Sequence, residues 1–362
     1  MKIGIITIWD INANYGNKLQ NYAVIKLLQQ KGHDVHTIVY YKNHLRILIK
    51  YICNGLTGCR LKGKTFQLRQ RRLLKSEKFN RLYLNPDTRS FRKRLSEKKY
   101  NAFILGSDQV WNTEFWKSDA KIKLFLMKGI PNYKKIALAP SFGTTELPEQ
   151  YKKDFKIALN AIPFLSVRET EGAEIIERLI GRKVPVLVDP TLMLNASEWK
   201  KISKKPKYMN NSNDYILGYF LGTVPGEKIK LIKEKCNLPI YYLSNEECSA
   251  LLEVDPCEFI YLISHAKLVL TDSFHACVFS FIFEKPFVVY NRNDHYVEMS
   301  GRIQELLKMF YLEQRHEHKV KLENLFDSDY RQGKKVLLDK KTEFDNYLSK
   351  ALNSLAKHER YR

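Results

Sequence analysis

Short apolar runs alternate with longer helical segments along most of the chain, and this alternation constrains the fold more than any other feature. A strand followed by a helix and another strand is typical of a parallel sheet with crossover helices. The sequence therefore predicts the α/β class. We expect strands at residues 2–8, 35–41, 102–105, 135–141, 164–168, 184–188, 215–221, 239–243, 268–271 and 287–290. We expect helices at residues 16–30, 150–161, 170–180, 226–236, 256–264 and 276–283.

The alternation stops once, at a polar and lysine-rich stretch over residues 195–213, and then starts again. A chain of 362 residues also exceeds the size at which single cores usually stop growing. We therefore predict two Rossmann-like domains that face a cleft, over 1–194 and 214–330, with that stretch as the linker. The N-terminal domain is expected to carry a basic helical insertion at about 45–99. A C-terminal helix within 331–362 is expected to pack back on both domains.

A polar turn follows the expected strand 268–271. It contains Ser273, Phe274 and His275, and the apolar helix 276–283 begins directly after it. Ligands bind at the carboxyl ends of strands in such sheets, and a helix N-terminus there favours an anion. His275 can exchange a proton near neutral pH, although a histidine at a strand end often only bonds to a backbone carbonyl. The turn is therefore a candidate site for an anionic substrate.

Two further expected strands end in polar residues. Arg168 ends the strand 164–168, and its planar guanidinium can pair with a carboxylate or phosphate through two hydrogen bonds. Ser107 and Asp108 follow the strand 102–105 in a Gly-Ser-Asp turn. Asp108 is a candidate base for an acceptor hydroxyl, or a cap of the next helix. Because three such turns lie at strand ends, we expect them to share one cleft.

The motifs also occur in an order that belongs to a known family. With them the chain resembles the polysaccharide pyruvyl transferases, and the resemblance covers most of its length. It implies a fold similar to the two-domain GT-B arrangement of many glycosyltransferases, with the donor held between the two halves. The motifs lie at residues 1–6, 14–23, 106–112, 166–169, 188–192 and 272–276.

The resemblance also implies an activity. Such enzymes take phosphoenolpyruvate and join its pyruvyl unit to a sugar, usually as a cyclic ketal on two hydroxyls, with release of phosphate. The expected acceptor is a sugar of a bacterial surface polysaccharide, such as a capsule or exopolysaccharide, or its lipid-linked precursor. Phosphoenolpyruvate is then a co-substrate, and this chemistry requires neither a cofactor nor a metal.

The family's functional residues can be carried over only in part. Its donor-binding arginine falls on Arg168, and its Arg-Leu-His triplet aligns with residues 273–275. The histidine is kept, so His275 is the expected general acid. The first position of the triplet is a serine here, so a second cation for the donor is missing from its usual place. Arg292 and Arg302, a little downstream, are the candidates to replace it.

The loop after the first expected strand contains Asn14, Gly16 and Asn17. A dinucleotide-binding loop at this place would carry the Gly-x-Gly-x-x-Gly pattern, and one glycine is too few for it. The sequence therefore excludes a nicotinamide-dependent enzyme. The loop either contacts the sugar acceptor or makes a tight turn.

The charge of the chain is unevenly distributed. Its formal net charge is +22, and residues 60–99 contain 15 Lys or Arg against 3 acidic residues. Just upstream, residues 45–52 mix bulky apolar side chains with two cations, as interfacial helices do. We expect peripheral attraction to an anionic membrane that carries a lipid-linked acceptor. A solvated helical excursion is the simpler alternative, and the lack of any nucleic-acid-binding motif disfavours nucleic acid as the partner.

Two rival functions remain at this point. One is a GT-B-type glycosyltransferase that uses a nucleotide sugar, since architecture alone does not separate it from a pyruvyl transferase. The other is a non-catalytic basic scaffold of a polysaccharide assembly machine.

The sequence also bears on localisation. The N-terminus does not resemble a signal peptide, and no apolar stretch approaches the roughly 20 residues that cross a bilayer. The six cysteines contain no Cys-x-x-Cys pair, which disfavours a zinc site and favours buried thiols in a reducing compartment. We expect a cytoplasmic protein that acts at the inner face of the cytoplasmic membrane.

Overall fold

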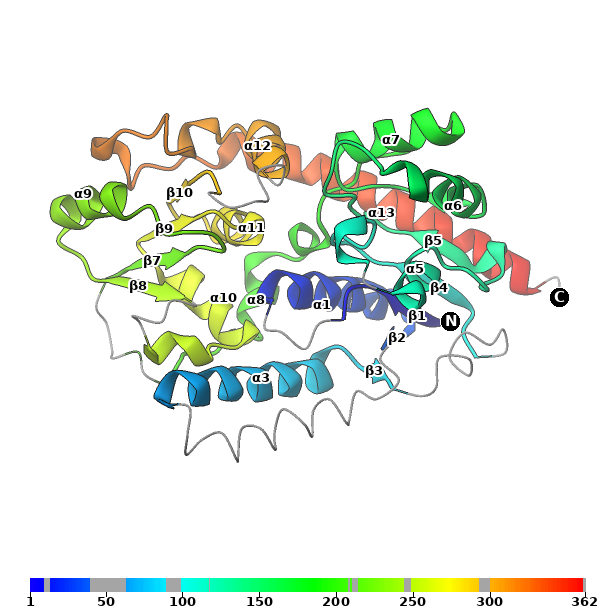
Figure 1. Cartoon of the computed structure of the whole chain (residues 1–362), viewed down its shortest axis with the longest axis horizontal. Coiled ribbons are helices and arrows are strands. Elements are labelled where there is room, and N and C mark those ends of the chain that lie inside the picture. The colour runs from blue at the N-terminus through cyan, green and yellow to red at the C-terminus, as the bar shows by residue number, and fades with distance from the viewer. Residues whose placement is uncertain are drawn as a thin grey trace.

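The computed structural model contains two separate parallel sheets with helices around them (Figure 1). The predicted interfacial segment 45–52 lies outside the described residues, as do 89–98 of the basic insertion and 210–213 of the linker. The structure describes residues 1–9, 14–39, 63–88, 99–116, 118–207, 209, 214–243, 249–292 and 300–360.

The N-terminal sheet has six strands in the order β3-β2-β1-β4-β5-β6, and every neighbouring pair is parallel. All four residues of β4 are buried, as expected for a parallel sheet with helices on both faces. The strand order reverses between β1 and β4, so the loops that follow these strands flank a crevice. The strands are β1 (Lys2–Ile6), β2 (Asp34–Ile38), β3 (Pro86–Asp87), β4 (Ala102–Leu105), β5 (Lys135–Ala137) and β6 (Phe164–Leu165).

The C-terminal sheet has four parallel strands in the order β10-β9-β7-β8. Its order reverses between β7 and β9, and this places the turn after β9 at the second crevice of the molecule. The two sheets confirm the predicted α/β class with two Rossmann-like units. The strands are β7 (Ile216–Tyr219), β8 (Ile240–Leu243), β9 (Leu268–Thr271) and β10 (Phe287–Val289).

The helices connect these strands and cover the sheets (Figure 1). Their ends follow local sequence signals: α10, for example, begins with a capping box between Asp255 and Glu258 and has Pro256 in its first turn. The α-helices of the described residues are α1 (Tyr15–Gln30), α3 (Gly63–Tyr83), α5 (Asp119–Phe125), α6 (Glu149–Asn160), α7 (Thr170–Ile180), α8 (Ala196–Lys200), α9 (Gly226–Cys236), α10 (Pro256–His265), α11 (Phe274–Ile282), α12 (Ser300–Met309) and α13 (Arg331–Arg360).

One prediction fails at a proline. The expected strand 184–188 makes only an isolated bridge, between Val186 and Val167, because Pro185 has no N–H with which to extend a ladder. Within the basic insertion, helix α3 ends at Tyr83, and Pro86 begins β3 at the edge of the N-terminal sheet. An edge strand tolerates proline because its outer N–H groups need no partner.

The stretch expected to be a plain linker contains helix α8. Its Trp199 is completely buried, and the Nε1–H of its ring donates to the carbonyl of Thr191 at 3.1 Å. The ring centroid lies 5.4 Å from that of Tyr22 in α1 and 4.9 Å from that of Phe279 in α11. The residue thus packs between the N-terminal and C-terminal units, a role that the polar composition around it concealed.

Helix α13 also contacts both units. Near its start, Gly333 lies against Phe281 and Phe310 of the C-terminal unit. Further along, the hydroxyl of Tyr347 donates to the carbonyl of Ala137 in β5 at 2.8 Å. In the part of the chain that the structure describes, no helix combines the length and the apolar character needed to span a bilayer.

We predict that Trp199→Ala lowers the free energy of unfolding by about 3–5 kcal/mol, because it opens a cavity between the units. Urea denaturation followed by far-UV circular dichroism measures the change. Leu338→Ala on α13 is the control, since Leu338 is 67% exposed and its loss should cost less than about 0.5 kcal/mol. Equal denaturation midpoints for the two variants would contradict the packing role of Trp199.

Candidate functional site

The polar turns predicted at strand ends come together between the two units, around the buried carboxylate of Asp189. Its Oδ2 accepts from Nη1 of Arg168 at 2.8 Å and from the hydroxyl of Ser107 at 3.4 Å, and it lies 3.6 Å from Nε2 of His275. Its Oδ1 accepts from the backbone N–H and the hydroxyl of Thr191 at 3.0 and 2.7 Å. Asp189 therefore connects Arg168 of the N-terminal unit with His275 of the C-terminal unit.

Asp189 and Arg168 each shift the pKa of the other. Burial alone would raise the pKa of Asp189, but the neighbouring His275 and the charge of Arg168 hold it well below its usual range. Burial alone would lower the pKa of Arg168, but the carboxylates of Asp189 and Glu169 raise it. Both groups are therefore charged at neutral pH, and each compensates the burial of the other.

His275 is packed tightly against the N-terminal unit. It follows Phe274, the first residue of α11, and an ideal Cβ on Gly16 would lie only 2.0 Å from Nδ1 of its ring. Only glycine therefore lets α1 approach the ring this closely. Nε2, on the other side of the ring, has no hydrogen-bond partner among the described residues.

The loop residues predicted beside Gly16 hold a second turn in place. The side chain of Asn14 caps α1 by accepting from the N–H of Asn17 at 3.1 Å. The amide of Asn17 donates to Oδ2 of Asp108 at 2.9 Å, while Oδ1 of Asp108 accepts from the N–H of Gln109 at 2.8 Å. Asp108 has a φ of +81°, so these bonds hold a strained turn. Neither carboxylate oxygen of Asp108 therefore caps a helix.

Two arginines approach the ring of Phe274. The guanidinium carbon of Arg168 lies 5.1 Å from the ring centroid, and that of Arg302, from α12, lies 5.9 Å from it. Burial, followed by the charge of Arg168, lowers the pKa of Arg302 to about 10. Arg302 still remains charged at neutral pH. When the Gln109 amide is oriented with its oxygen toward Arg302, this oxygen accepts from Nη2 and Nη1 of Arg302 at 2.6 and 3.2 Å.

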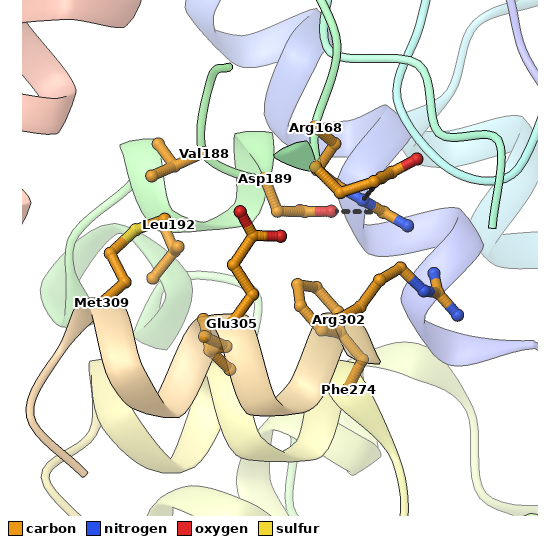
Figure 2. A pocket seen from close by; sticks show the side chains of 10 residues that line it. Arg168, Val188, Asp189, Leu192, Phe274, Arg302, Glu305 and Met309 are labelled. Atoms are coloured by element: carbon orange, nitrogen blue, oxygen red, sulfur yellow. Dashed lines mark hydrogen bonds and ion pairs between the residues drawn. The ribbon is translucent and has the colours of Figure 1, made fainter. Parts of the chain in front are cut away.

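Arg168, Phe274 and Arg302 line a small pocket with a cavity volume of about 30 Å³. Figure 2 shows Arg168 paired with Asp189 on one side of it, and Phe274 and Arg302 on the other. Nε and Nη2 of Arg168 and Nε of Arg302 are buried without hydrogen-bond partners among the described residues. Unpaired guanidinium donors in a pocket are a site for an anion. The rest of the lining consists of two carboxyl groups, Glu169 and Glu305, and of the apolar side chains of Val188, Leu192, Leu306 and Met309.

Glu305 is the third carboxyl group that lines this pocket, with those of Asp189 and Glu169. Glu305 of α12 accepts from the hydroxyl and the N–H of Thr170 at 2.5 and 3.3 Å, and so joins α12 to the first turn of α7. Burial raises the pKa of Glu305, and the nearby charges of Glu171 and Glu169 act in the same direction.

The structure thus brings most of the predicted site residues to one place. Ser273, the position without the family's arginine, is buried and precedes Phe274. Arg302 lines the pocket, whereas Arg292 is not among the described residues that do so. No group of three or more His, Cys, Asp or Glu side chains suited to a metal is present in the described ranges.

Sequence reasoning missed Asp189, Gln109 and Glu305. Asp189 directly follows the expected strand 184–188, which is the signal that selected Arg168, and it could have been found in the same way. Glu305 carried no such signal, because only the packing of α12 against the N-terminal unit brings it to the pocket. Gln109 lies in the motif 106–112, but its contact with Arg302 depends on the same packing.

We predict that Gly16→Ala lowers the free energy of unfolding by about 1–3 kcal/mol, because its Cβ would overlap the His275 ring. In a His275→Ala background the same change should be neutral or stabilising, since the ring is gone and alanine favours a helix. Thermal and urea denaturation of the four proteins of this cycle measure the coupling.

Gly226→Ala is the control for this cycle, because a Cβ there has no heavy atom within 4 Å. A destabilisation by Gly16→Ala that does not depend on residue 275 would contradict the close contact.

Comparison with solved structures finds similar chains among sugar-nucleotide enzymes. A UDP-GlcNAc 2-epimerase from Neisseria meningitidis is 11% identical, with 97% of this chain and 100% of that chain covered and a TM-score of 0.47. A UDP-GlcNAc 2-epimerase from Methanocaldococcus jannaschii is 12% identical, with 94% and 99% covered and a TM-score of 0.42. An E. coli heptosyltransferase is 12% identical, with 83% and 90% covered and a TM-score of 0.37.

Comparison of the sequence gives a clearer result. No curated protein matches the chain significantly. The family model described as polysaccharide pyruvyl transferase matches residues 14–295, which include the Asn14 loop, Arg168, Asp189 and His275. The chain belongs to the polysaccharide pyruvyl transferase family.

Proposed function

We propose that this transferase moves the pyruvyl group of phosphoenolpyruvate onto a sugar of a bacterial surface polysaccharide or its lipid-linked precursor. The product is a cyclic ketal, and phosphate is released. The observation that carries the proposal is a pair of arginines with unpartnered donor atoms, the buried Arg168 and the partly buried Arg302, which line a small pocket together with Asp189, 3.6 Å from His275. Phosphoenolpyruvate has two anionic groups, and this pocket has two cations to meet them.

Arg302 takes the place of the missing second cation in this proposal. The family's first triplet position is Ser273 here, and a serine supplies no charge to a donor. Arg302 reaches the same ring, Phe274, from a different helix. Its own partner is the neutral amide of Gln109, so its charge is available to an anion. The apolar wall beside it suits the methylene carbon of the donor.

Formation of the ketal requires two protons to move. Two C–O bonds form at the central carbon of the donor, its bond to the phosphate oxygen breaks, and its double bond becomes single. One hydroxyl proton of the acceptor ends on the methylene carbon, which becomes a methyl group, and the other ends on the phosphate. We assign the proton delivery to His275, whose unpartnered Nε2 lies beside Asp189 and whose ring is fixed by Gly16.

Asp108 is assigned a positioning role for the acceptor loop. Its carboxylate is bonded to Asn17 and to the following N–H, so it holds the two N-terminal turns together. The acceptor is then expected to lie against Asn14, Gly16, Asn17 and Ser107.

One contact argues against the nucleotide-sugar alternative. The carboxylate of Asp272 accepts from the N–H of Leu221 at 2.7 Å and from that of Gly222 at 2.8 Å. This loop follows β7 at the reversal of the C-terminal sheet, where a nucleotide phosphate would need such donors. A buried negative side chain already occupies them, which supports pyruvyl transfer.

We predict that His275→Ala lowers turnover by roughly 10²–10⁴-fold while the dissociation constant of phosphoenolpyruvate changes little. Phosphate release measures turnover, and calorimetry measures binding. His265→Ala, at the exposed end of α10, is the matched control and should behave as the wild type. Full turnover in His275→Ala would reject the role of this residue.

We predict that Arg302→Ala and Arg168→Lys each weaken phosphoenolpyruvate binding by at least about tenfold, since each removes charged hydrogen bonds. Arg168→Ala should also lose the donor, but it leaves Asp189 without its cation, so the lysine variant separates binding from stability. Arg178→Ala on the exposed face of α7 is the control. Unchanged donor affinity in both pocket variants would exclude the two-arginine site.

A further inference from the structure

The basic side chains of helix α3 fall into two sets, one that packs inward and one that faces outward. One face of it packs inward: Nζ of Lys75 lies 3.1 Å from Glu258 and 3.6 Å from Glu253, both in the C-terminal unit. Toward the N-terminal unit, Asn80 of α3 accepts from Nζ of Lys18 in α1 at 3.0 Å. Lys75 therefore binds the two units together and is not available to an external partner.

The opposite face of α3 carries a different set of side chains. Arg71, Leu74, Lys78, Arg81 and Leu82, which we call the α3 stripe, follow the i, i+3, i+7, i+10, i+11 spacing of one helical face. Leu74 and Leu82 are 48% and 64% exposed. The side chains of Arg71 and Arg81 are 58% and 60% exposed, and Lys78 is exposed as well.

The positive charge of the α3 stripe is compensated only in part, by two ion pairs. Glu77 is the only acidic residue of α3, and it is buried. It lies 3.3 Å from Arg81, and Glu253 lies 3.9 Å from Arg71, so both pairs join a largely exposed arginine to a carboxylate and are weak. An exposed helical face with three cations, two leucines and no exposed acid is unusual for a solvated surface helix.

We propose that the α3 stripe docks the protein on an anionic membrane surface. The cations complement acidic lipid headgroups, and the leucines are placed to enter the boundary between headgroups and acyl chains. The helix is about 30 Å long, so it can lie along the membrane over its whole length. Nucleic acid would leave the two leucines unexplained, since single strands are bound through stacking on aromatic side chains, and the stripe has none.

This inference does not rest on the proposed reaction. It would, however, hold the protein at a membrane that can carry a lipid-linked acceptor. Membrane binding and donor binding involve different residues, so the failure of one proposal leaves the other intact.

Co-sedimentation of the full-length protein with vesicles tests the proposal. The protein should bind phosphatidylglycerol/phosphatidylcholine vesicles and not pure phosphatidylcholine vesicles. Each basic residue near an anionic surface contributes about 1 kcal/mol, about fivefold in affinity. The triple variant Arg71→Gln, Lys78→Gln, Arg81→Gln should therefore bind at least about tenfold more weakly, and Leu74→Ser with Leu82→Ser should also bind more weakly.

Helix α6 offers a matched control on another surface, with the exposed residues Lys152, Lys153, Lys156 and Ile157. The triple Lys→Gln variant there removes the same charge, and Ile157→Ser removes an apolar side chain that is 61% exposed. Both should bind vesicles as the wild type does, and far-UV circular dichroism checks that every variant is folded. No binding to anionic vesicles, equal losses in the α3 and α6 variants, or stripe-dependent binding to RNA or an acidic protein without vesicle binding would each overturn the proposal.

Discussion

The buried charge of Asp189 is the interaction on which the rest of the site depends. A carboxylate with no solvent exposure of its side chain is stable only when cations and hydrogen-bond donors surround it. Arg168, Thr191 and Ser107 supply them from the N-terminal unit, and His275 approaches from the other unit. The same carboxylate therefore keeps Arg168 charged, sets the place of His275 and helps to hold the two units in register.

The pocket next to Asp189 can receive an anion because Asp189 uses only part of Arg168. One nitrogen of the guanidinium bonds to the carboxylate, while Nε and Nη2 have no hydrogen-bond partner among the described residues, although Nε lies 3.9 Å from a carboxylate oxygen of Glu169. Arg302 adds a second, partly buried cation from α12, and both guanidinium groups lie close to the ring of Phe274. Burial and, after it, the charge of Arg168 lower the pKa of Arg302, and an anion between the two guanidinium groups would relieve their repulsion.

The sequence predicted the parallel α/β class, the strands β4 and β9 and the helices α7 and α9, because each has a strong period and a clear boundary. It also selected Arg168 and His275, since both stand at strand ends. It named Arg302 as one of two candidates for the second cation but could not choose it over Arg292, because only the packing of α12 brings Arg302 to the pocket. It also misjudged residues 184–188 and the region of Trp199, where a proline and a single buried ring override the local pattern. The boundaries given for the domains, and the roles of the site residues, stay predictions.

Calorimetric titration of the purified protein with phosphoenolpyruvate, and in parallel with UDP-, GDP- and CMP-sugars, tests the central claim most directly. The account predicts saturable binding of phosphoenolpyruvate and no binding of the nucleotide sugars, because two cations face the pocket while Asp272 occupies the backbone donors of the C-terminal crevice. Binding of a nucleotide sugar without binding of phosphoenolpyruvate would contradict the account and favour a glycosyltransferase on the same fold.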